Sequence, residues 1–353
     1  MNTALGLLII AIGSFGQSSS YVPIKKVKNW AWETFWLTQG LFAWLVFPFL
    51  GALLAVPEGS TLGSILAVDK TSTIFGLEMT PAWGAMIFGV LWGVGGLTFG
   101  LSMRFLGVAL GQSIALGTCS AFGTIIPALF FDKQNLLHGP GLILLLGVCI
   151  TLAGISVIGF AGGLRAKNMT EEQKKAAIKD FALTKGLLVA LLAGVMSACF
   201  ALGLGAGQPI ADAAKVLGAS DLFATLPATF MVTLGGFLTN AVYCLFQNYK
   251  NKTFRDYTKT PGNVWVNNLL FCALAGILWY SQFFGLSMGK SFLADNAIML
   301  AFSWSILMAL NVTFSNVWGI LLKEWKGCSG KTISVLVMGL VVLIFSVFFP
   351  NFF

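Results

Sequence analysis

Amide and aromatic side chains lie inside runs of otherwise apolar residues in this chain. An unpaired polar group is costly in hydrocarbon, so each amide must hydrogen-bond to another helix or contact a ligand. Aromatic rings stack on the apolar face of a sugar, while amides hydrogen-bond to its hydroxyls. A bond between helices explains any single residue equally well, but the set together favours a site for a neutral sugar or polyol. The candidate substrate-binding residues are Trp92, Gln112, Trp279, Tyr280, Gln282, Trp304 and Asn311.

The carboxylates near these runs stand at the run ends, which favours a neutral substrate over a cationic one. A proton-coupled carrier needs a titratable group that meets water from each side in turn. Glu33 is the first candidate for that group, and an interfacial glutamate paired with a lysine is the alternative reading. Asp221 and Asp295 are further candidates, or N-caps of helices. Arg104, also at a run end, either forms a gate ion pair or extends its side chain to the interface.

Residue patterns typical of enzymes are absent from the sequence. It has a single histidine, His138, and no GxSxG, HExxH, Walker or dinucleotide motif. The six cysteines are scattered without CxxC spacing, so they read as free thiols rather than metal ligands. We therefore expect no enzymatic activity, metal or cofactor, and an ion gradient is the expected source of energy for active transport.

The elements that must position these residues are membrane-spanning helices. Hydrophobic residues make up 57% of the chain and charged residues only 10%, whereas soluble proteins have about 25% charged residues. The apolar runs are each close to the roughly 20 residues that cross a bilayer. They predict about ten helices, and Pro48, Pro127 and Pro227 predict kinks within them. The runs lie near 3–22, 34–56, 82–103, 109–130, 140–161, 186–206, 221–247, 264–288, 296–322 and 332–350.

The basic residues are concentrated on one side of the predicted membrane. Of the 21 lysines and arginines, all but Lys70, Lys133, Lys215 and Lys290 fall in the odd-numbered loops. The positive-inside rule then makes those loops cytoplasmic and places both termini outside, in the periplasm. Topology thus explains the net charge of +8, and no soluble basic stretch is long enough to indicate a nucleic-acid partner.

A repeated phrase indicates an internal duplication. Leu91-Trp92 followed by FGLSM at 99–103 recurs as Leu278-Trp279 followed by FGLSM at 284–288, about half of the 353-residue chain later. We interpret residues 1–163 and 186–353 as two repeats of five helices, joined by a polar cytoplasmic linker at 164–185. Because five is odd, the repeats enter the membrane from opposite sides. This is a common plan for secondary transporters, with the substrate site near the midplane between the repeats.

Several stretches make the chain similar to the bacterial L-rhamnose:proton symporter family of the drug/metabolite transporter superfamily. They are YVPIKKVKNWAWET at 21–34, GLSMRFLG at 100–107, WYSQFF at 279–284, Ser303-Trp304 and LKEW at 322–325. The resemblance implies inverted five-helix repeats, an inner-membrane location and L-rhamnose uptake coupled to protons. It also carries over a set of site residues, which adds Asn268 to those above. The carried-over residues are Glu33, Trp92, Arg104, Asn268, Trp279, Gln282 and Trp304.

The sequence therefore predicts a secondary active transporter that takes up L-rhamnose or a closely similar monosaccharide with protons, by alternating access. The alternative is an exporter or facilitator of another small neutral metabolite on the same fold. A membrane sensor is disfavoured because no cytoplasmic segment is large enough to signal. The expected partners are the sugar, protons and membrane lipid.

Overall fold

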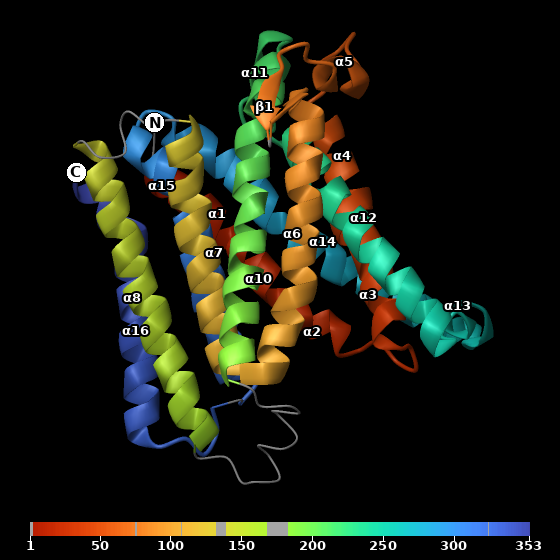
Figure 1. The fold of residues 1–353 in the computed structure, drawn as a ribbon, viewed down its shortest axis with the longest axis vertical. Coiled ribbons are helices and arrows are strands. Elements are labelled where there is room, and N and C mark those ends of the chain that lie inside the picture. The colour runs from red at the N-terminus through yellow and green to blue at the C-terminus, as the bar shows by residue number, and fades with distance from the viewer. Residues whose placement is uncertain (1–2, 75, 107, 132–138, 168–182, 324) are drawn as a thin grey trace. The chain divides into compact units, whose positions relative to one another are not determined.

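The computed structural model describes residues 3–74, 76–106, 108–131, 139–167, 183–323 and 325–353, and long helices dominate them (Figure 1). The elements of the first half are α1 (Thr3–Ser19), α2 (Tyr21–Ile24), α3 (Trp32–Gly40), the π-helix η1 (Leu41–Val46), α4 (Phe47–Leu53), α5 (Leu62–Leu66), β1 (Ser72–Ile74), β2 (Leu77–Met79), α6 (Pro81–Leu106), α7 (Val108–Phe131) and α8 (Pro140–Lys167). Those of the second half are α10 (Leu183–Ala206), α11 (Gln208–Val216), α12 (Leu226–Asn251), α13 (Arg255–Lys259), α14 (Gly262–Leu293), α15 (Ala297–Leu321), α16 (Gly330–Phe348) and η2 (Phe349–Phe352).

The described part of the chain contains nine segments that are long and apolar enough to cross a membrane. The remaining predicted crossing corresponds to α7, within which Ile114–Leu129 is a shorter apolar helix. The protein is thus an all-α, multi-pass membrane protein, as the apolar runs predicted. The only sheet in the described residues is the two-stranded hairpin of β1 and β2, which turns at Gly76 with a φ of +79°.

The chain forms two compact units, each of which contains helices from both halves of the sequence. Unit 1 consists of Val94–Leu202 and Leu293–Phe353, and unit 2 consists of the residues up to Gly93 together with Gly203–Phe292. These units therefore differ from the two repeats expected from the sequence. Most of the expected linker at 164–185, namely residues 168–182, lies outside the described residues.

Within unit 1, α8 and α16 lie side by side, as Figure 1 shows. Small residues bring their backbones together: Gly154 faces Leu343, and Gly339 faces Ile158. α7 and α15 pack against each other and against α8. Close approach at glycine is the usual way in which helices associate in lipid.

Within unit 2, α3, η1 and α4 form one continuous helical segment that packs along α12. α1 crosses α14 where Gly13 meets Gly285 and Ser281. α6 crosses α12 at Gly89 and Gly235, where a side chain on either glycine would strike the backbone of the other helix. These contacts hold the segments that carry the aromatic site residues described below.

Unit 2 also has a cap of short elements that the sequence analysis did not predict. Figure 1 shows α11, α5 and β1 gathered at one end. Ile65 of α5 and Ile210 and Ala214 of α11 are fully buried together against Ala228 of α12. The apolar stretches in α5 and α11 are too short to resemble a membrane span. The sequence therefore predicted a loop where the structure has this cap.

Pro227 and Pro48, two of the three prolines predicted to kink a helix, both lie in the first turn of a helix. Pro227 does not kink a helix, because α12 begins at Leu226 rather than near residue 221. A proline in the first turn costs nothing there, since its missing N–H would have no partner in the helix. Pro48 follows the π-helix η1, in which the N–H of Phe47 donates to the carbonyl of Phe42. The predicted irregularity at Pro48 is therefore a widened turn.

Candidate functional site

Three tryptophans from three different segments meet in unit 2. The ring of Trp44, from η1, lies edge-on to those of Trp92 in α6 and Trp279 in α14, with both centroid distances 6.0 Å. Trp92 and Trp279 stack on each other at 5.8 Å with an interplanar angle of 30°. The structure thus brings together the two tryptophans that the duplicated phrase singled out.

Trp36 extends this group, and we call Trp36, Trp44, Trp92 and Trp279 the tryptophan cluster. The Trp36 ring lies edge-on to Trp44 at 5.7 Å. Trp36, Trp92 and Trp279 are partly exposed, whereas Trp44 is buried. Trp36 and Trp44 are not among the binding residues predicted from the sequence, although their spacing of eight residues, about two helical turns, was the available signal.

Glycines make room for these rings. Trp44 lies over Gly40, where a methyl group would stand 2.6 Å from the ring. Trp92 lies over Gly236 of α12, and a methyl group at that position would overlap the ring. The positions of both tryptophans therefore depend on the absence of a side chain beneath them.

Some polar side-chain atoms around the cluster form hydrogen bonds, and others have no partner in the described part of the chain. Trp36 Nε1 donates to Asn240 Oδ1 at 3.2 Å, and Asn240 Nδ2 donates to the carbonyl of Gly236 at 2.9 Å. Trp44 Nε1 and Gln39 Oε1 are both buried and have no hydrogen-bond partner in the described part of the chain. A ligand hydroxyl is one group that would satisfy such atoms.

Gln282 and Tyr280 lie next to Trp279 on α14. Gln282 is buried, and its Nε2 donates to the carbonyl of Trp279 at 3.1 Å. Tyr280 is fully buried with its ring against Phe283 and Phe284, and its hydroxyl has no partner among the described residues. Gln282 is therefore hydrogen-bonded to the backbone of a member of the tryptophan cluster, whereas Tyr280 packs among phenylalanines.

Asn268 holds the backbone of another segment. Its Oδ1 accepts from the N–H of Lys28 at 2.9 Å, and its Nδ2 donates to the carbonyl of the same residue at 2.7 Å. This pair of bonds fixes the segment between α2 and α3. Both ends of the amide are engaged, which assigns it a structural role in this conformation.

Unit 1 carries a second aromatic group around Trp304 of α15. Its ring stacks on Phe200 at 5.7 Å, lies over Gly123, and leaves a buried Nε1 without a partner in the described part of the chain. The next residue, Ser305, is 2.7 Å from the hydroxyl of Thr124. Asn311 is buried further along the same helix. The side chains of the other two candidates, Arg104 and Gln112, lie outside the described residues.

Glu33 is buried in the first turn of α3, and neutral donors hold its carboxylate. Oε1 accepts from Asn251 Nδ2 at 2.9 Å and from the Thr253 hydroxyl at 2.8 Å. Within the described residues no lysine or arginine forms an ion pair with it, so the alternative reading, a glutamate paired with a lysine, finds no partner there. Burial raises the pKa of nearby Tyr257, whose hydroxyl donates to the carbonyl of Thr34 at 3.2 Å. That phenol stays protonated at neutral pH. The acidic groups of this network are Glu33, which is buried, and Asp256, which is partly exposed and accepts from the Thr34 hydroxyl at 3.0 Å.

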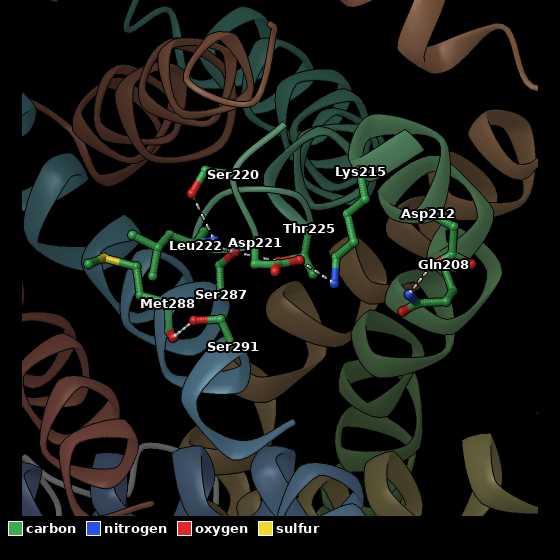
Figure 2. A network of polar contacts seen from close by, with 10 residues as sticks. All are labelled: Gln208, Asp212, Lys215, Ser220, Asp221, Leu222, Thr225, Ser287, Met288 and Ser291. Carbon is green, nitrogen blue, oxygen red and sulfur yellow. Dashed lines mark hydrogen bonds and ion pairs between the residues drawn. The ribbon is translucent and has the colours of Figure 1, made fainter. Parts of the chain in front are cut away.

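The other acidic candidates lie at exposed positions. Asp221 forms a 2.8 Å ion pair with Lys215, and the two side chains are 67% and 47% exposed (Figure 2). Asp295 is exposed in the turn before α15, where Asn296 rather than Asp295 supplies the N-cap, by accepting from the N–H of Met299. Neither aspartate is an N-cap, and neither is secluded from water.

The two copies of the FGLSM phrase use their serines differently. In Figure 2, Ser287 accepts from the Thr225 hydroxyl at 2.7 Å and donates to the carbonyl of Leu222 at 2.9 Å. Ser102, the equivalent residue, donates to Phe99 in its own helix at 2.8 Å. The second copy therefore anchors the segment that precedes α12, while the first makes a local bond.

The comparisons with known proteins agree with this architecture. The family model described as L-rhamnose-proton symport protein (RhaT) matches residues 1–349. The chain belongs to this family. Proteins named L-rhamnose-proton symporter from Yersinia pestis (strain Pestoides F) and Yersinia pseudotuberculosis (serotype O:1b, strain IP 31758) are each 31% identical to it over 350 residues, covering 98% of this chain and 96% of theirs. The resemblance inferred from the sequence is confirmed.

Membership of the L-rhamnose-proton symport family fits a site made of aromatic and amide side chains. In the part of the chain that the structure describes, no group of three or more histidine, cysteine, aspartate or glutamate side chains is placed to hold a metal ion. The chemistry that the described side chains offer is stacking, hydrogen bonding and a single buried carboxylate at Glu33. This is binding chemistry suited to a sugar and a proton.

Proposed function

We propose that this protein is a secondary active transporter that takes up L-rhamnose together with protons by alternating access. The family match over residues 1–349 is the observation that carries the proposal. The aromatic and amide character of the site supports a sugar substrate, because rings and amides complement the two kinds of surface that a pyranose presents. The proton gradient supplies the energy and no cofactor takes part.

The sugar binds at the tryptophan cluster, where the partly exposed rings of Trp92 and Trp279 offer stacking surfaces. The methyl-bearing, apolar side of L-rhamnose is suited to such rings. Gln282, whose side chain donates to the backbone carbonyl of Trp279, is the amide candidate beside that ring. Trp304, with its buried unpaired Nε1, and Asn311 are the corresponding candidates in unit 1.

Glu33 carries the proton. In the ionised state its Oε1 accepts from both Asn251 and Thr253, which join α3 to the last residue of α12 and to the segment after it. Protonation turns one carboxylate oxygen into a donor and weakens its acceptance of these bonds. The protonation state therefore biases the packing of α3, the helical segment that leads to Trp36 and Trp44.

The helix contacts within the units support the inverted repeats. α3 packs on α12, α7 on α15 and α8 on α16, which pairs each helix with its expected counterpart in the other repeat. α1 contacts α14 at Gly13, and α6 contacts α10 where Gly95 meets Ser197. In the two repeats α1 corresponds to α10, and α6 corresponds to α14. The contact between α1 and α14 is therefore equivalent to the contact between α10 and α6. The excess of lysine and arginine in the odd loops supports an inner-membrane protein with both termini in the periplasm.

The alternative, an exporter or facilitator of another small neutral metabolite, predicts no uptake driven by a proton gradient. The discriminating experiment measures labelled L-rhamnose in proteoliposomes with an inward proton gradient, and again after a protonophore removes it. We expect accumulation above the external concentration only with the gradient. Competition by L-fucose, L-mannose, L-lyxose and D-glucose then ranks the substrates. Equal uptake with and without the gradient would establish a facilitator.

A further inference from the structure

Two buried polar atoms beside the tryptophan cluster lack partners in the described part of the chain: Trp44 Nε1, a donor, and Gln39 Oε1, an acceptor. The two side chains are only 4% and 2% exposed. Buried polar atoms in native proteins are nearly always paired. The donor and the acceptor belong to one helical segment and stand five residues apart in sequence, so they are candidates for binding a single group from outside the chain.

The local helix geometry brings Gln39 and Trp44 closer to the same side of the helix. Trp44 belongs to η1, where the helix closes its turn over five residues instead of four. Each residue of a wider turn rotates less around the helix axis than a residue of an α-helix. Residues 39 and 44 therefore point in more similar directions than they would in an α-helix. Trp44 also lies against Gly40, the residue next to Gln39. Single π-turns within α-helices occur frequently at functional sites.

Trp36 provides an internal contrast, because it lies on the same helical segment and in the same cluster. Its Nε1 already donates to Asn240, so it has no capacity left for a ligand. Trp44 contacts Trp36, Trp92 and Trp279, and is the buried member of the cluster. Its unpaired N–H therefore belongs to a ring that contacts both Trp92 and Trp279, the rings proposed to hold the sugar.

A hydroxyl can accept one hydrogen bond and donate another at the same time, whereas a carbonyl only accepts and an ammonium only donates. We propose that Trp44 and Gln39 recognise one ring hydroxyl of the sugar, which accepts from the Trp44 N–H and donates to the Gln39 amide oxygen. This inference rests on the proposed function, and it assigns the pair as specificity-determining residues. A sugar without that hydroxyl leaves both atoms unpaired, which is the condition under which a site discriminates strongly.

The test uses calorimetric binding to the purified full-length protein in nanodiscs. The ligands are L-rhamnose and its analogues that each lack one ring hydroxyl. For the wild type we expect one analogue to bind about tenfold more weakly than L-rhamnose. Trp44→Phe keeps an aromatic ring and removes the N–H, so it should bind L-rhamnose about as weakly as the wild type binds that analogue. Gln39→Met should lose discrimination against the same analogue.

Trp36→Phe is the matched control, and we expect it to keep the discrimination because the Trp36 N–H is used by Asn240. If Trp44→Phe folds poorly, benzothienylalanine at that position keeps the ring shape without the N–H and gives the same readout. Unchanged discrimination in the Trp44 and Gln39 variants, with intact wild-type binding, would overturn this inference and leave the transport function standing. Failure of the wild type to bind L-rhamnose would instead overturn the proposed function.

Discussion

At the scale of single residues, Glu33 is unusual because its carboxylate is buried and bonded to neutral donors, Asn251 and Thr253. A buried glutamate that pairs with a fixed lysine would be held in the charged state. Neutral partners allow either protonation state, as a proton carrier requires. Asp221, in contrast, forms an exposed ion pair with Lys215, which contributes about 0–1 kcal/mol.

We therefore predict that Glu33→Gln abolishes gradient-driven accumulation of L-rhamnose and leaves exchange of internal for external sugar. Glutamine retains an acceptor oxygen for the bonds from Asn251 and Thr253 but cannot carry a proton. Because binding of sugar and proton must be reciprocal, the wild type should bind L-rhamnose more tightly as the pH falls, and the variant should lose this dependence. Proteoliposome uptake and calorimetry at several pH values measure both effects.

Asp212→Asn is a suitable control for this variant, since Asp212 is exposed and, among the described residues, accepts from Gln208 of its own helix. It should accumulate sugar like the wild type. If Asp221→Asn abolished accumulation while Glu33→Gln retained it, the proton-carrying role would belong to Asp221.

At the scale of elements, the tryptophan cluster depends on how helices approach one another. α6 and α12 are close at Gly89 and Gly235, and the adjacent Gly236 lies beneath the ring of Trp92. Thr239 of α12 also donates to the carbonyl of Val90 at 3.0 Å. The orientation of Trp92 is thus set by glycines and a hydroxyl on a neighbouring helix.

Gly236→Ala should displace the Trp92 ring and weaken L-rhamnose binding. Adding a methyl group to a well-packed site costs about 1–3 kcal/mol, which corresponds to a loss of about fivefold or more in affinity if the bound arrangement bears the strain. Binding calorimetry and thermal unfolding measure the two contributions. Gly96→Ala is the control on α6, because a methyl group at Gly96 meets nothing within 4 Å. Equal affinity of the two variants would show that Trp92 does not hold the sugar.

The sequence predicted the elements well where the signal was local and less well where it was not. Apolar runs identify the long helices because each run must cross the hydrocarbon by itself. The wide turn at Leu41–Val46 has no such signal, because a π-helical turn and an α-helix have the same apolar composition here. Trp92 and Trp279 were found through the repeated phrase, whereas Trp44 occurs outside it and the structure was needed to place it in the cluster.

At the scale of the whole molecule, the duplication and the charge map lead to the same topology. An odd number of helices per repeat reverses the second copy, and most of the lysines and arginines lie in the odd loops of both copies. Contacts cannot reveal orientation in a membrane, because a protein and its inverted placement have identical contacts. Only the distribution of charge carries that information.

This topology predicts opposite results for reporters placed at two points of the chain. A C-terminal alkaline phosphatase fusion should be active and a C-terminal green fluorescent protein fusion dark, because the C-terminus is expected in the periplasm. The same reporters inserted after Lys259, in the basic segment between α13 and α14, should give the reverse result. Changing Lys250, Lys252, Arg255 and Lys259 to glutamine should weaken this preference, because cytoplasmic retention depends on basic residues close to the helix ends. A fluorescent C-terminal fusion in a transport-competent protein would reverse the assigned orientation while leaving the duplication intact.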